Sequence, residues 1–214
     1  PGSAVFWWFF EYINRFVQNW HYWGIDNYSP VEYALQASMS FSTVLPAVLS
    51  TTALLTTIPR LTRPLARFWP VALPWPRFWS WLILAGAAGG LTMIGVWPNY
   101  LYSLLWMAPL LVIAAFQTIL GETPVFAPVQ KGDWRPVWLP ALAALICGFF
   151  WELWNWKSLA HWEYSVPLVD HFHIFEMPLL GYAGYLPFGL ECVVVADLIR
   201  QFFKRRNIRF FYYS

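Results

Sequence analysis

Six long stretches of this chain are apolar enough, and long enough, to be read as membrane-spanning helices. A transmembrane helix needs about 20 mostly apolar residues. Only 11% of the residues are charged, whereas 59% are hydrophobic and 21% are aromatic, which is more apolar surface than a soluble core of this size requires. We therefore expect an all-α polytopic membrane protein of about six helices. Their expected ranges are 1–20, 31–58, 78–97, 100–120, 136–156 and 174–203.

The basic residues lie on one side of this expected topology. All 13 Lys and Arg residues except Arg15 and Lys157 fall in three segments, 59–77, 121–135 and 200–214. Because cytoplasmic loops carry the excess of Lys and Arg, these segments are expected in the cytoplasm. Six spans then place the N- and C-termini in the cytoplasm as well. The net charge of +2 is too small to indicate a nucleic-acid partner.

Two segments resemble each other at a nearly constant offset. Glu152 minus Glu11, Asn155 minus Asn14 and Pro187 minus Pro46 each give 141. A W-x-Y pattern follows in each copy, with Trp162 and Tyr164 lying 142 residues after Trp20 and Tyr22, and Glu176 lies 144 residues after Glu32. We interpret this as a parallel duplication of spans one and two as spans five and six, with chance similarity among aromatic-rich helices as the alternative.

The duplication sets the expected organisation of a single membrane domain over residues 1–214. The expected parts are repeat A at 1–58, connecting spans at 78–120, repeat B at 136–203 and a basic cytoplasmic tail at 204–214. In this register Pro1 corresponds to Leu142, near the middle of the fifth span. We therefore expect the natural chain to begin about ten residues upstream.

Carboxylates of the two copies form the first candidate site. Glu and Asn at positions i and i+3 share one face of a helix, and an ionisable group that faced lipid would cost at least a few kcal/mol. Carboxylates gathered in a dry pocket favour retention of a proton, which suits a general acid. Interfacial caps facing outer water are the alternative. The candidate catalytic residues are Glu11, Glu32, Glu152 and Glu176, and the candidate ligand-binding residues are Asn14, Asn155, Trp20, Tyr22, Trp162 and Tyr164.

Two further groups of residues are candidates for chemistry. Glu191 lies inside the sixth expected span, where an ionisable residue is a functional-site hypothesis. Asp170, His171 and His173 combine the ligand types that bind zinc, iron or manganese, so a divalent metal is a possible cofactor, with water-facing interfacial histidines as the alternative. The sequence requires no other cofactor. Cys147 and Cys192 lie in apolar runs and indicate buried thiols rather than a disulfide.

The two W-x-Y segments carry a resemblance to known families. NWHYWGIDNYSPVEYALQASMSF and HWEYSVPLVDHFHIFEMPLLGYAGYLPF are similar to the integral-membrane lycopene cyclase and carotenoid hydratase families. That resemblance implies duplicated multi-span units and acid-catalysed carbocation chemistry, with Glu32 and Glu176 as the acids. Where those families have P-x-E-E, this chain has Glu32-Tyr33 and Glu176-Met177, without the second acid. FWELWN and FEMPLLGYAGYLPFGLE also resemble uncharacterised bacterial membrane proteins, which implies the bacterial inner membrane and no particular activity.

Three functions are consistent with these features. The first is a protein that binds or modifies an apolar lipid or isoprenoid in an outer-face pocket of carboxylates and aromatic residues. The second is a non-catalytic accessory subunit of a larger membrane complex, in contact with pigments or lipids. The third is a small transporter. The partners expected in common are membrane lipids, other membrane subunits or pigments, and whether the chain is an enzyme stays open.

Overall fold

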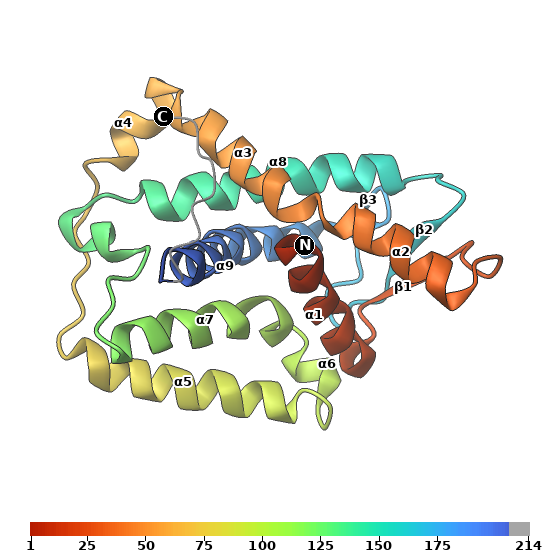
Figure 1. Cartoon of the computed structure of the whole chain (residues 1–214), viewed down its shortest axis with the longest axis horizontal. Helices are drawn as coiled ribbons and strands as arrows, with labels where there is room; N and C mark the ends of the chain where they lie inside the picture. The colour runs from red at the N-terminus through yellow and green to blue at the C-terminus, as the bar shows by residue number, and fades with distance from the viewer. Residues whose placement is uncertain (206–214) are drawn as a thin grey trace.

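The chain is described by a computed structural model over residues 1–205, with side chains over residues 1–203, so the expected tail at 204–214 lies outside the described side chains. The fold is mostly helical, with two short antiparallel ribbons (Figure 1). The helices are α1 (Gly2–Val17), α2 (Pro30–Phe41), α3 (Val44–Thr56), α4 (Pro59–Leu65), α5 (Pro76–Met93), α6 (Pro98–Leu101), α7 (Leu104–Ile119), α8 (Arg135–Asn155) and α9 (Tyr185–Arg205), with 3-10 turns η1 (Ala127–Lys131) and η2 (Leu179–Gly184). The strands are β1 (Trp20–Trp23), β2 (His161–Tyr164), β3 (His173–Ile174) and β4 (Met177–Pro178).

Three of the expected spans have the length and composition to cross a membrane. They are Pro30–Thr56, which contains α2 and α3, Arg135–Asn155, which is α8, and Leu179–Phe203, which contains η2 and most of α9. The other three expected spans fold as α1, α5 and α7, with 16, 18 and 16 residues, each shorter than the about 20 residues of a full span. The structure thus confirms a helical chain with membrane-spanning potential.

The two ends of the molecule differ in the elements that they carry. Figure 1 shows β1, β2, β3 and α2 gathered at one end, while α4 and the long connections that precede α5 and α8 lie at the other. The helices α3, α8, α9, α7 and α5 run between these ends. The ribbons were not expected from the sequence, which indicated loops at these positions.

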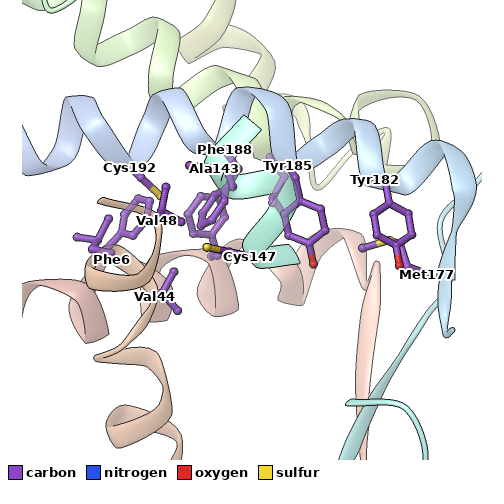
Figure 2. Packing of buried hydrophobic residues seen from close by; sticks show 14 of the residues in the cluster. Phe6, Val44, Val48, Ala143, Cys147, Met177, Tyr182, Tyr185, Phe188 and Cys192 are labelled. Carbon is purple, nitrogen blue, oxygen red and sulfur yellow. The ribbon is translucent and has the colours of Figure 1, made fainter. Parts of the chain in front are cut away.

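Close helix contacts around α9 form the core. A Cβ on Gly189 would lie 2.1 Å from the Pro140 carbonyl oxygen, so only glycine allows α9 to lie this close to α8. Aromatic rings attach α1 and α7 to the same helix, with ring centroids 5.8 Å apart for Phe6 and Phe188 and 5.9 Å apart for Trp106 and Phe188. Figure 2 shows side chains of α1, α3, α8 and α9 meeting in this cluster.

A serine from α1 separates α2 from α3. The Ser3 hydroxyl donates to the Phe41 carbonyl (2.6 Å) and accepts from the Leu45 amide (3.0 Å), so it stands where the direct helical hydrogen bond between those two groups would form. Pro46 follows and has no N–H to donate. A side chain inserted into the hydrogen-bond ladder is a recognised cause of a helix break, and the break positions α2 over the ribbon end of the molecule.

Candidate functional site: an aromatic cavity beneath the β1–β2 ribbon

The two W-x-Y segments pair with each other as an antiparallel ribbon. In the register of β1 and β2, Trp20 lies opposite Tyr164 and Tyr22 lies opposite Trp162. Residues two apart in a strand point to the same face, and cross-strand partners share that face. All four aromatic side chains therefore project from one face of the ribbon, and all four are buried or half-buried. The opposite face carries His21 and Glu163, which are exposed.

Glu11 binds three aromatic donors with one oxygen. Its Oε1 accepts hydrogen bonds from the Tyr22 hydroxyl (2.6 Å), the Trp7 indole N–H (3.0 Å) and the Trp20 indole N–H (3.2 Å). Trp7 comes from the preceding turn of α1, whereas Trp20 and Tyr22 come from β1. The carboxylate therefore fixes the first strand of the ribbon against the helix that carries it.

Glu152 occupies the matching place in α8 and is completely buried. Its Oε1 accepts from the Tyr164 hydroxyl and the Tyr185 hydroxyl, both at 2.7 Å, and the Trp162 indole N–H donates to the Tyr164 hydroxyl at 2.8 Å. Its Oε2 has no hydrogen-bond partner among the described residues. Glu152 thus joins the second strand to α8 and α9, as Glu11 joins the first strand to α1.

The two asparagines use their amides to hold the strand backbone. Asn14 donates to the Trp20 carbonyl (2.8 Å) and accepts from the Asn19 amide (2.8 Å). Asn155 donates to the Trp162 carbonyl (2.7 Å) and accepts from the Trp162 amide (2.8 Å). The E-x-x-N pattern therefore places both groups toward the following W-x-Y strand, with Glu binding its side chains and Asn binding its backbone.

A cavity of about 890 Å³ lies against this aromatic face. Its walls come from the ribbon, α2, the start of α7, the end of α8 and the η2 segment. The aromatic residues of the lining include Trp7, Trp20, Tyr22, Tyr33, Trp106, Trp151, Trp162, Tyr164 and Tyr185, and Ala183 also lines it. Within the described part of the chain, no Asp, Glu, Lys or Arg lines it. Glu11 and Glu152 therefore lie behind the wall and hold the residues that form it.

Burial affects the tyrosines that line the cavity from the ribbon. It raises the pKa of Tyr22 well above the ordinary tyrosine value, with the Glu11 carboxylate adding to the effect. It also raises the pKa of Tyr164, with smaller contributions from Tyr185 and Glu152. A raised pKa keeps each phenol protonated and available as a donor to its carboxylate.

The other two expected acids lie apart from this arrangement. Glu32 is exposed, and with Ser29 it forms a capping box at the start of α2, in which its Oε2 accepts from the Ser29 amide (2.9 Å). The expectation that four glutamates converge is therefore wrong for Glu32, because its carboxylate is engaged in helix capping. Glu176 is half-buried in the turn between β3 and β4 and does not line the cavity.

The remaining candidates are also separate from the cavity. Asp170 pairs with His173 at 2.9 Å, and His171 does not join them; no group of three His, Cys, Asp or Glu ligands occurs in the described residues. The expected metal site is thus absent from the described chain. Glu191 is completely buried in α9, and neither of its carboxylate oxygens has a described hydrogen-bond partner.

Several residues of the cavity were not expected from the sequence. Trp7 lies one helical turn before Glu11, at the i, i+4 spacing that brings side chains together, so its contact with Glu11 could have been predicted from the sequence. Tyr185 and Trp106 come from other helices and gave no local signal. Asn19 and His161 each directly precede a W-x-Y segment, and both line the cavity.

No known protein family, curated protein or solved structure matches this chain. The geometry of the cavity is therefore the basis for a functional conclusion.

Proposed function

We propose that this chain is an integral membrane protein that binds a neutral apolar lipid, of the isoprenoid kind, in the cavity beneath the β1–β2 ribbon. The observation that carries the proposal is a cavity of about 890 Å³ lined mostly by aromatic and aliphatic side chains, with some neutral polar ones and no Asp, Glu, Lys or Arg of the described chain. Ligand pockets commonly measure about 300–1,000 Å³ and are mostly apolar. A phospholipid headgroup or a charged metabolite would leave its charge without a partner in such a site.

The cavity has apolar residues at its rim. Met39 of α2 and Leu180 of η2 both line it, and their side chains are largely exposed. Both lie in segments that are long and apolar enough to cross a membrane. A lipid would then enter from the bilayer, between these two segments, without passing through water.

A six-span topology with both termini in the cytoplasm is part of this proposal. It places the ribbon and cavity at the outer face of the bacterial inner membrane. The basic segments 59–77 and 121–135 belong to the connections at the opposite end of the molecule in Figure 1, which supports a cytoplasmic location for that end. In this arrangement α1, α5 and α7 complete the helical layer within the bilayer.

The internal duplication is also part of the proposal, and two structural correspondences support it. The helices α3 and α9 begin at Val44 and Tyr185, which differ by 141. The antiparallel register of β1 and β2 has local two-fold symmetry, with each Trp opposite the Tyr of the other strand. Such an axis runs perpendicular to the ribbon, and parallel repeats are related by a two-fold axis along the membrane normal.

A complementary exchange of side chains provides a third correspondence. At offset 141, Trp7 corresponds to Gly148 and Val44 corresponds to Tyr185. A Cβ on Gly148 would lie 2.4 Å from the Tyr185 ring, so the glycine makes room for the tyrosine that reaches Glu152. Around Glu11 the helix itself provides the third donor, Trp7, and the position in α3 that corresponds to Tyr185 is the smaller Val44. Each copy thus has one large donor beside its glutamate. In the first copy it comes from the helix that carries the glutamate (Trp7), and in the second copy it comes from the following helix (Tyr185).

Binding is favoured over acid catalysis by the position of the carboxylates. A general acid must come within hydrogen-bond reach of the atom that it protonates. Glu11 and Glu152 do not line the cavity, and Glu32 caps α2. The chemistry implied by resemblance to lycopene cyclases would need one of these groups in the wall, so we place binding first.

An accessory subunit of a larger membrane complex is the second candidate. The observation that favours it is the outer face of α5, where Phe78, Trp79 and Trp81 are each more than 40% exposed. Aromatic residues of this kind suit contacts with other subunits or pigments as well as lipid. This candidate is compatible with a lipid in the cavity.

Lipid extraction from the purified protein tests the proposed function. The cavity-filling variant Ala37→Trp is compared with Leu35→Trp, which adds the same side chain on the exposed face of α2. We expect an organic extract, analysed by mass spectrometry, to contain a neutral lipid in near-stoichiometric amount with the natural chain and with Leu35→Trp, and to lack it with Ala37→Trp. Equal lipid content in all three would contradict the proposal.

A second cavity-filling variant guards against a folding defect. A Cβ on Gly184 would contact only the Trp106 ring, at 3.7 Å, so Gly184→Phe adds a ring to the cavity with little backbone strain. Loss of the lipid from both filled variants, with unchanged thermal stability in detergent, would support the site. Retention in both would exclude it.

A further inference from the structure

Asn19 has a buried side chain that the protein leaves without a partner. It is 2% exposed and lines the cavity, yet neither its Nδ2 nor its Oδ1 forms a hydrogen bond with any described residue. Its backbone is fixed on both sides, because its N–H donates to Asn14 (2.8 Å) and its carbonyl accepts from the Ser165 amide (2.9 Å). The side chain is therefore held at the cavity wall with both of its polar atoms unused.

Such an unpaired amide is unfavourable unless something binds it. A buried polar group without a hydrogen bond costs about 1–3 kcal/mol, and more than nine in ten buried polar groups in proteins have a partner. The side-chain amides of the two other asparagines in this region, Asn14 and Asn155, both form hydrogen bonds with the strand backbone. Asn19 is thus the exception in a network whose other amides are paired.

His161 repeats this arrangement at the other end of the ribbon. It follows Asn19 by 142, the same offset that relates the two W-x-Y segments, and it also lines the cavity. Its Nδ1 is buried without a described partner, while its Nε2 lies 3.4 Å from Glu163. His161 pairs with Trp23, four residues beyond Asn19, so the two groups lie roughly 13 Å apart at about 3.3 Å per residue of strand.

We infer that the lipid bound in the cavity carries an uncharged oxygen function, a hydroxyl or a carbonyl, which hydrogen-bonds the Asn19 amide. This inference rests on the proposed function and narrows the ligand class to a prenol-like or quinone-like lipid. A carboxamide has two donors and an acceptor, so it binds a carbonyl through Nδ2 and a hydroxyl through either atom. The aromatic and aliphatic side chains that make up most of the remaining wall offer the apolar contacts that an isoprenoid body needs.

Asn19 is the polar group that we assign to the ligand, because His161 lies two residues before Glu163 in β2 and its ring contacts Glu163 on the opposite face of the ribbon. The neutral lining excludes a phosphate or carboxylate headgroup, since no described Lys or Arg is present to pair with it. Asn19 therefore determines the orientation of the ligand, and the aromatic side chains determine the affinity for its apolar body.

Three isoprenoid probes that differ in their oxygen groups separate the parts of this inference. Squalene is a hydrocarbon, geranylgeraniol carries a hydroxyl, and a benzoquinone with a two-unit prenyl chain carries carbonyls. Delipidated protein in nanodiscs is titrated with each probe, with native mass spectrometry to count bound molecules and quenching of tryptophan fluorescence to follow the quinone. We expect the oxygenated probes to bind about tenfold more tightly than squalene, which corresponds to about 1.4 kcal/mol.

Asn19→Leu tests the anchor directly, because leucine has a similar size and no hydrogen-bonding group. We expect it to lower affinity for the oxygenated probes about tenfold and to leave squalene binding unchanged. Asn99→Leu is the matched control, since Asn99 is exposed in α6 and away from the cavity.

The outcomes distinguish the inference from the proposed function. If squalene and the oxygenated probes bind the natural chain equally well, the inference is overturned and the cavity stands as a general apolar site. If none of the three binds, the proposed function fails with it. The comparison of probes on the natural chain also decides the matter should Asn19→Leu fail to fold.

Discussion

At the scale of single residues, the two glutamates are best understood as acceptors that order an aromatic wall. Glu152 is completely buried, and its Oε1 binds two tyrosine hydroxyls that would otherwise be buried without an acceptor. A buried carboxylate is tolerated when charge-assisted hydrogen bonds surround it. The carboxylates that the sequence indicated as a catalytic site thus hold the aromatic side chains that form the cavity wall.

Removing the acceptor at Glu152 should destabilise the protein strongly. In Glu152→Leu the hydroxyls of Tyr164 and Tyr185 lose their common partner, at about 1–3 kcal/mol for each buried group. Glu152→Gln keeps an acceptor oxygen and should cost much less. Thermal unfolding in detergent, followed by near-ultraviolet circular dichroism, measures the difference. If Gln and Leu at this position lower the melting temperature equally, the acceptor role is wrong; exposed Glu163→Leu serves as control.

The raised pKa of Tyr164 predicts a pH dependence of stability. Its phenol stays protonated in the folded protein at pH values where an exposed tyrosine in the unfolded chain loses its proton, near pH 10. Folding is therefore stabilised by this group below pH 10, and that contribution is lost as pH rises from there through the folded-state pKa. The stability difference between the natural chain and Tyr164→Phe should be constant from pH 7 to 9.5 and fall above it. A difference that grows with pH would contradict this assignment.

At the scale of elements, the sequence predicted helices well and their junctions poorly. Apolar runs such as 136–156 are long and continuous, so α8 appears within one residue of its expected bounds at either end. The break between α2 and α3 depends on the Ser3 hydroxyl of another helix, so Pro46 was its only local signal. The S-P-V-E pattern at 29–32 was readable as a capping box, yet the sequence interpretation assigned Glu32 to the site.

The site was predictable only where its residues are close in sequence. E-x-x-N followed by W-x-Y was recognised in each copy, and the structure places these four side chains together. The pairing of β1 with β2 joins residues 138 to 144 positions apart, from Trp23 with His161 (138) to Trp20 with Tyr164 (144). Four-residue strands carry too little alternation to predict such long-range pairing.

The complementary exchange at Trp7 and Val44 can be tested by grafting. Trp7→Gly should remove a large half-buried side chain, at up to about 3–5 kcal/mol. Val44→Tyr alone should overpack the same space, at about 1–3 kcal/mol. Together they recreate the Gly148–Tyr185 arrangement, with the new phenol next to Glu11. We expect the double variant to be more stable than the sum of the single effects by at least about 1 kcal/mol.

The control for this graft uses the neighbouring tryptophan. Trp8 points to α2, where its indole N–H donates to Ser38 (2.9 Å), and it makes no hydrogen bond to Glu11. Combining Trp8→Gly with Val44→Tyr should therefore give additive losses. Additivity in the Trp7 pair as well would remove this support for the duplication.

At the scale of the whole molecule, shape and charge both support the proposed orientation in a membrane. The ribbon end carries the aromatic cavity, and the connections at the other end contain Arg60, Arg63, Arg67 and Lys131. Three segments have the length and composition to cross a bilayer, and the exposed surfaces of α5 and α2 are largely apolar. Because lipid neither donates nor accepts hydrogen bonds, the helices must satisfy their own backbone, whereas ribbons and irregular segments belong at the two ends.

Cysteine labelling tests this orientation with sites at the two ends. Asp26 lies in the exposed turn after β1, and Lys131 lies in the exposed connection before α8. The natural Cys147 and Cys192 are buried, so they add little background. In intact bacterial cells, a membrane-impermeant maleimide should label Asp26→Cys at once, and Lys131→Cys only after the membrane is broken. The reverse pattern would show that the protein has the opposite orientation. Labelling of both sites in intact cells would show that the chain does not separate these two ends across a bilayer. Either result would contradict a cavity at the outer face.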